Sequence, residues 1–75
     1  MNKSNYYDFT CILHNVDKGK DIEAEVDHFV PGSHLLVVIN KVIEVRLNYN
    51  AKHKEYVGSK AGMEFKTNGP KAINY

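Results

Sequence analysis

The chain has 75 residues and a formal charge of +1, with ten basic side chains, nine acidic side chains and one cysteine. This length predicts a single domain over residues 1–75, near the lower size limit at which a core folds without disulfides or metals. A lone cysteine excludes an intrachain disulfide and a cysteine-based zinc site, and we expect Cys11 to be a small core residue.

The absence of a long apolar run predicts a cytoplasmic protein that does not enter a membrane. The first ten residues contain no apolar run like that of a signal peptide, and the longest apolar run, at 35–39, is too short to cross a bilayer.

Residues 1–30 carry three basic and six acidic side chains, whereas residues 41–75 carry seven basic and three acidic ones. We interpret these as solvated outer faces that attract one another, in preference to an electrostatic binding site.

Apolar and polar side chains alternate in the first part of the chain. This pattern predicts strands at 6–16 and 21–30, joined by a turn at 17–20 in which Gly19 supplies a positive φ. The predicted inward pairs are Leu13 with Ala24, Cys11 with Val26, Phe9 with His28, and Tyr7 with Val30. The apolar faces of the two strands coincide in this register, which favours a hairpin.

The densest apolar run lies at 34–49 and reads HLLVVINKVIEVRLNY. Its many Val and Ile residues lose side-chain freedom in a helix and pack well in a sheet, so we predict two strands that turn about Asn40 and Lys41. A helix capped by Ser33 is the alternative. Four apolar residues fit its period of 3.6 residues: Leu35, Val38, Ile39 and Val42.

The predicted turn divides the side chains of this hairpin between two apolar faces. The expected core face contains Leu36, Val38, Ile43, Val45 and Leu47. The expected outer face contains Leu35, Val37, Ile39 and Val42. Such a face is unusual on a monomer, and covering it would contribute about 1.5–3 kcal/mol for each side chain fully buried. The cover is either another part of the chain or a partner.

After Tyr49 the polarity pattern predicts strands at 54–58 and 63–67, joined by a turn at 59–62 that places Tyr56 opposite Phe65. The tail at 68–75 has too little apolar content to predict an element, so the expected ordered core covers about residues 6–67. About five to six short strands with short turns predict an all-β fold: a small antiparallel meander closing into a barrel or a two-layer roll.

No residue pattern in the chain is typical of a catalytic, metal or cofactor site, and we expect a protein that is not an enzyme and holds no cofactor. His28 and His34 lie near Cys11 on the predicted inner face, and two imidazoles with one thiolate suit zinc. Without a known ligand spacing, ordinary half-buried histidines are the preferred interpretation.

The preferred functional hypothesis is a protein-interaction module or accessory subunit. The outer face of the 34–49 hairpin would mediate self-association into a homo-oligomer, or binding to a protein partner.

The alternative hypothesis is a small barrel that binds single-stranded nucleic acid through its basic C-terminal half. The candidate residues are Arg46, Tyr49, Lys52, Lys54, Tyr56, Lys60 and Lys66. The predicted register buries both tyrosines, and the acidic half of the chain would repel a phosphate backbone, so this hypothesis is less favoured.

Overall fold

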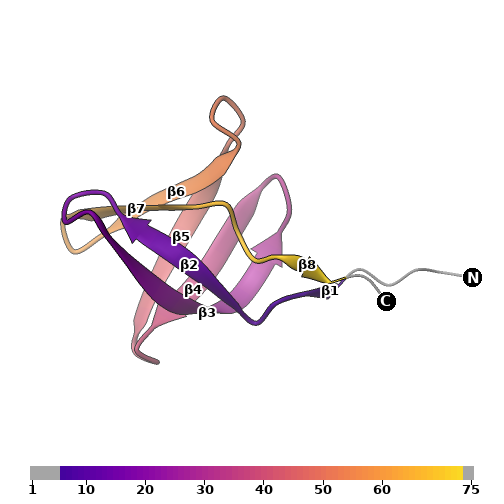
Figure 1. Ribbon diagram of the computed structural model, residues 1–75, viewed down its shortest axis with the longest axis horizontal. Coiled ribbons are helices and arrows are strands. Elements are labelled where there is room, and N and C mark those ends of the chain that lie inside the picture. The colour runs from indigo at the N-terminus through magenta and orange to yellow at the C-terminus, as the bar shows by residue number, and fades with distance from the viewer. Residues whose placement is uncertain (1–5, 74–75) are drawn as a thin grey trace, which may run out of the picture.

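A computed structural model describes residues 6–73, in which every regular element is a β-strand (Figure 1). The strands are β1 (Tyr6–Tyr7), β2 (Thr10–Asn15), β3 (Lys20–Val30), β4 (His34–Ile39), β5 (Ile43–Asn50), β6 (Glu55–Lys60), β7 (Met63–Thr67) and β8 (Ala72–Ile73). Within these residues no helix has the length and hydropathy needed to span a membrane.

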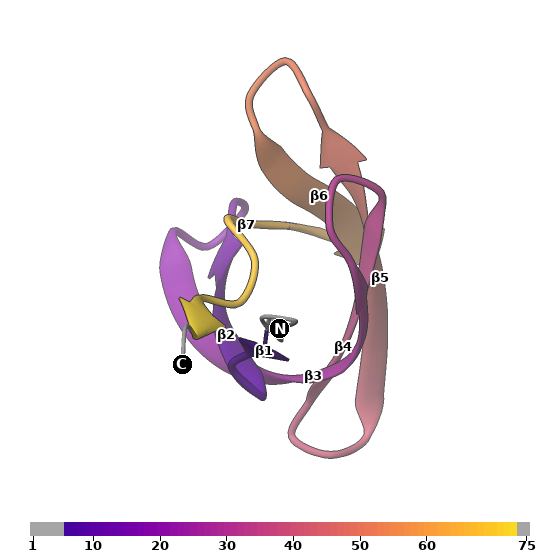
Figure 2. The ribbon, with the colours of Figure 1, turned by 90° about the vertical axis from the view of Figure 1, so that its right-hand side faces the viewer.

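Strands β2 to β7 form a closed antiparallel barrel in chain order, and β1 pairs with β8 in a separate short ribbon. Figure 2 looks along the barrel and shows the ring of strands, with the β1–β8 ribbon at the end facing the viewer. The ring closes between β2 and β7, where His14 pairs with Lys66 and Asn15 with Phe65. The predicted all-β barrel is confirmed, and 34–49 is a hairpin rather than a helix.

The core is formed by side chains that alternate along each strand of the barrel, as a sheet with one buried face requires. Its buried apolar members are Cys11, Leu13, Ala24, Leu35, Val37, Ile39, Val45, Leu47, Tyr56 and Phe65. This set comes from all six barrel strands, so the interior is a single packed cluster.

The predicted faces of the 34–49 hairpin are wrong for its first strand. Val37 pairs with Val45 and Leu35 with Leu47, whereas the predicted turn paired Val38 with Ile43. Asn40 and Lys41 lie in the turn, as predicted, and both have positive φ, but Val42 also belongs to the turn, because Ile39 pairs with Ile43. One extra turn residue shifts the register by one position and exchanges the two faces of β4.

The outer hairpins keep their predicted faces although their turns are displaced. Cys11 pairs with Ala24 rather than with Val26, because the first turn covers residues 16–19. Tyr56 pairs with Thr67 rather than with Phe65, because the last turn covers only residues 61–62. Each register differs from the prediction by two positions, and a shift of two leaves every side chain on its original face.

A β-bulge in β3 overturns the prediction for the end of that strand. The pairing of β3 with β4 shifts between Val26 and His28, so Asp27 is the extra residue. Beyond the bulge Phe29 packs against the core and His28 is exposed, the reverse of the predicted alternation. Phe9, expected in the core, is 87% exposed beside this irregular region, where its carbonyl oxygen accepts a hydrogen bond from the N–H of Val26.

Aromatic side chains close the end of the barrel that carries β1 and β8. Tyr56 lies between Phe29 and Tyr49, with ring centroids 5.5 Å and 5.0 Å away, and Tyr7 meets Phe29 edge-on at 4.9 Å. Gly69 packs on the Tyr56 ring, where an added Cβ would lie 3.2 Å from Cε1. The tail therefore covers this end of the barrel, in a part of the chain for which the sequence predicted no element.

The Tyr56 hydroxyl accepts a hydrogen bond of 2.8 Å from the N–H of Gly32 and so connects β6 to the β3–β4 turn. We expect Tyr56→Phe to lower the free energy of unfolding by about 1 kcal/mol, the net contribution of one such bond. Urea denaturation would measure the change. Tyr49→Phe is the matched control, because within the described residues no hydrogen bond involves its hydroxyl. Equal effects of the two substitutions would contradict this role for the Tyr56 hydroxyl.

Candidate functional site

The end of the barrel opposite the β1–β8 ribbon is surrounded by the β2–β3, β4–β5 and β6–β7 turns (Figure 1). It contains a cavity of about 330 Å³, which we call the mouth. The mouth is lined by Asn15, Lys18, Lys20, Asp21, Ile22, Ile39, Asn40, Ile43, Lys60, Ala61, Met63 and Phe65. It combines an apolar floor with a rim that carries three lysines.

The floor is apolar because inward-facing positions of the barrel continue to its open end. Ile39 and Phe65 are buried, whereas Ile43, on the same face as its partner Ile39, is 41% exposed. Strand β6 pairs with β5 only as far as Asn48 and Val57, so the first residues of β5 have no ladder neighbour on that side. This divergence leaves the Ile43 side chain open to solvent within the mouth.

Two rim lysines occupy inward-facing positions rather than the outer surface. Lys20 pairs with the buried Asn15, and Lys60 pairs with Met63, which packs against the core. Directly paired residues project to the same side of a sheet, so both lysines project from the inner face at the last position of the barrel. Their alkyl stems can line apolar surface there while the ammonium groups remain in water.

One carboxylate, Asp21, lies among the lining residues, and it already has a partner. Its Oδ1 accepts a hydrogen bond of 2.8 Å from Nδ1 of His14 on the neighbouring strand. Asn15 is also engaged, since its Oδ1 accepts from the N–H of Lys18 at 3.1 Å and its side-chain nitrogen lies 3.3 Å from the Met63 sulfur. The lining of the mouth therefore carries a net positive charge. The Asn15 side chain, the polar group on its floor, already contacts Lys18 and Met63.

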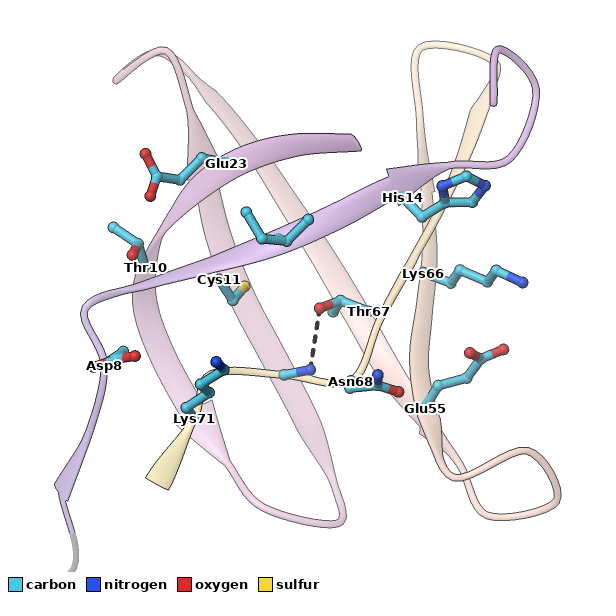
Figure 3. Close-up of a pocket in the computed structure, with 12 residues that line it drawn as sticks. Asp8, Thr10, Cys11, His14, Glu23, Glu55, Lys66, Thr67, Asn68 and Lys71 are labelled. Atoms are coloured by element: carbon cyan, nitrogen blue, oxygen red, sulfur yellow. Dashed lines mark hydrogen bonds between the residues drawn. The ribbon is translucent and has the colours of Figure 1, made fainter. Parts of the chain in front are cut away.

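A second cavity, of about 490 Å³, lies beside the gap where β2 and β7 diverge beyond the His14–Lys66 pair (Figure 3). Figure 3 places Glu23 and Thr10 at one end of this cavity and Lys66 and Glu55 at the other. Acidic and basic side chains are therefore mixed around this second cavity. Unlike the mouth, it does not place side chains of one charge beside an apolar floor. This cavity is larger than the mouth but lacks its separation of charge from apolar surface.

Cys11 lies in this second cavity and does not have the features of a reactive thiol. It is 6% exposed and belongs to the core cluster. Burial raises its pKa above the ordinary value, while a hydrogen bond with Thr67 lowers it in part. A raised pKa disfavours the thiolate, which is the nucleophilic form and the metal ligand.

The structure does not bring together the three residues considered for zinc. The His28 and His34 rings lie 5.5 Å apart between centroids, but both project from the outer face, on the side of Leu36 and Asn48. Cys11 projects into the core from β2. Within residues 6–73 no group of three potential ligands could hold a metal ion.

The predicted interaction face is not a surface. Leu35 and Val37 are fully buried and Ile39 is 4% exposed, so three of its four residues belong to the core. Val42 is 79% exposed at the tip of the β4–β5 turn. The two faces of β4 are exchanged, and the half-buried Leu36 and Val38 lie on the outside instead.

The residues considered for nucleic-acid binding are dispersed. Tyr56 is 5% exposed within the aromatic cluster, and Tyr49 is half-buried beside it. Lys52 and Lys54 lie in or at the end of the β5–β6 turn, whereas Lys60 belongs to the mouth at the opposite end of β6. Arg46 and Lys66 project from the outer faces of β5 and β7, and the set forms no single patch with an exposed stacking ring.

The mouth was not predicted from the sequence, although its parts were visible there. Ile22 and Met63 fall within the predicted strands at 21–30 and 63–67, but Lys20 and Lys60 fall within the predicted turns at 17–20 and 59–62. The signal that could have found them is the continuation of inward-facing positions by two residues, from Ile22 to Lys20 and from Gly58 to Lys60. In comparisons with known proteins, no family model, no curated protein and no solved structure matches this chain.

Proposed function

We propose that this protein is a non-enzymatic binding module that holds an apolar group in the mouth of its barrel. The observation that supports this proposal is the exposed Ile43, which stands on the inner face above the buried Ile39. A large aliphatic side chain inside a concave, solvent-filled cavity gains free energy when a ligand or partner replaces that water. The cavity lies at the lower end of the range of small-molecule sites, about 300–1,000 Å³.

Self-association through the 34–49 hairpin is not part of this proposal, because three of the four residues that would mediate it form the core. A symmetric dimer joined mouth to mouth is also disfavoured. In such an isologous contact each rim would meet its own copy, and Lys18, Lys20 and Lys60 would face three identical lysines. We therefore assign the mouth to a ligand or partner of different chemistry.

The simplest test uses a neutral alkyl probe and amide chemical shifts recorded by ¹H–¹⁵N NMR. We expect 1-octanol to bind with a Kd on the order of 1 mM, given its size and the limited area of the cavity. The largest shifts should occur at the floor of the mouth, at Ile22, Ile39, Ile43, Met63 and Phe65. Shifts confined to the β2–β7 gap, or no saturable shifts, would overturn the proposal.

Ile43→Ser should weaken octanol binding about fivefold. Because the side chain is less than half exposed, the ligand can bury only part of it, which corresponds to about 1 kcal/mol. Val42→Ser is the matched control: Val42 is the preceding residue, is 79% exposed, and does not line the mouth. Unchanged binding by the Ile43 variant, or equal losses in both variants, would contradict the assignment.

A further inference from the structure

We infer that the ligand of the mouth is an amphipathic carboxylate, with a short alkyl chain on the apolar floor and its carboxylate among Lys18, Lys20 and Lys60. This inference rests on the proposed function, because it assumes that the mouth binds an apolar group.

Three features of the rim support a negatively charged head group on the ligand. The lysines come from two separate parts of the chain: Lys18 and Lys20 from the β2–β3 turn and the first residue of β3, and Lys60 from the last residue of β6. Two of the three stand on inward-facing positions, so their ammonium groups are held at the edge of the floor. The single lining carboxylate, Asp21, pairs with His14 and accepts a hydrogen bond of 2.8 Å from it, at a strand position that faces away from Lys20.

Carboxylates just outside the lining set do not reverse this charge. Asp17 Oδ2 accepts a hydrogen bond of 2.7 Å from the N–H of Glu64, which holds it at the junction of the β2–β3 turn with β7. Glu64 pairs with Ser59, one position from the Lys60–Met63 pair, and therefore projects from the outer face of the barrel. The ammonium groups of the rim are the charges that a ligand on the floor would meet.

The side chains of the floor favour a linear alkyl chain over a flat ring system. Its floor is made of flexible aliphatic and thioether side chains, from Ile22, Ile39, Ile43 and Met63, with one aromatic side chain, Phe65. The aromatic residues with stacked or edge-on neighbours gather at the opposite end of the barrel. Phe65 is only 4% exposed, so its ring offers little surface on which a base or a planar ligand could stack.

The experiment compares three probes with one alkyl chain and different head groups: octanoate, 1-octanol and octylammonium. We expect octanoate to bind about tenfold tighter than octanol, and octylammonium to bind weakest, because exposed ion pairs each contribute a small increment. In about 1 M salt the advantage of octanoate over octanol should largely disappear, since the Debye length falls to about 3 Å. Octanoate binding no tighter than octanol overturns the inference while leaving the proposed function intact.

Lys20→Gln with Lys60→Gln removes two rim charges without removing the fold, because both side chains are exposed at strand ends. This double variant should lose most of the preference for octanoate and retain its affinity for octanol. Lys52→Gln, in the β5–β6 turn, is the matched control and should retain the preference. An unchanged preference for octanoate in the double variant overturns the inference. If the parent protein does not bind octanol, the proposed function itself is overturned.

Discussion

Val37→Lys should leave the protein largely unfolded at 25 °C. The side chain is fully buried, and its partners Val26 and Val45 lie on the same apolar face. An ammonium group there has no anion to pair with, and burying an unpaired charge costs about 4 kcal/mol or more. That is a large part of the stability available to a domain of this size. Circular dichroism and urea denaturation would measure the loss.

The adjacent substitution, Val38→Lys, should be neutral or slightly stabilising. Val38 is half-buried on the outer face of β4, where its two cross-strand partners are Glu25 and Glu44. A lysine between two carboxylates gains about 0.2–1 kcal/mol for each directly opposed pair. The two variants therefore test the register directly. If Val38→Lys unfolds the protein and Val37→Lys does not, the faces of β4 are those that a two-residue turn would produce.

This pair of residues also shows how far the sequence determines the fold. Alternation and β-branched residues were sufficient to predict an all-β barrel, because these signals depend on composition and period. The predicted faces of β2, of the first part of β3 and of β7 are correct although the predicted turns are displaced, because each displacement changes the register by two residues. The predicted face of β4 is wrong, because the turn at 40–42 has three residues rather than two. Nothing in Asn40-Lys41-Val42 specifies the length of the turn.

The candidate site was harder to predict than the fold for a related reason. The sequence predicts a binding surface where apolar side chains lack a cover, and that prediction depends on the face of β4. The mouth instead depends on which strands diverge at their ends, as β6 does from β5. Divergence follows from the stagger of the strands in the closed barrel and from the point at which two neighbouring strands stop pairing, here Asn48 and Val57. Local patterns carry little information about either.

Gly58→Ala should destabilise the barrel by about 3 kcal/mol, at the upper end of the usual cost of overpacking. Gly58 follows Val57, the last residue of β6 that pairs with β5, and packs against the β5 backbone. A Cβ there would overlap the carbonyl oxygen of Arg46 and would lie 3.1 Å from the Cα of Leu47. Both neighbours are backbone atoms of a strand whose side chain at Leu47 is fully buried, so neither can move without disturbing the core. Chemical denaturation would measure the change.

Two controls separate this steric effect from other effects of replacing glycine. Ser59→Ala changes the next, exposed residue and should alter stability by less than about 0.5 kcal/mol. Gly62→Ala has open space around its Cβ but a φ of +77°, so it should cost about 1 kcal/mol through backbone strain alone. Asparagine tolerates that conformation, so Gly62→Asn should be milder than Gly62→Ala, whereas Gly58→Asn should be at least as harmful as Gly58→Ala.

The Gly58 variants also connect the fold to the mouth. The close contact at Gly58 brings β6 against the backbone of Arg46, and two residues later the same strand carries Lys60 to the rim of the mouth. A variant that moves β6 outward while the rest of the barrel remains folded should therefore shift Lys60 and Met63 together and weaken octanol binding. In that case the NMR shifts of Gly58→Ala should centre on β5 and β6, with Ile22 on β3 little changed. Retained octanol affinity in a folded Gly58→Ala variant would show that the mouth does not depend on this contact.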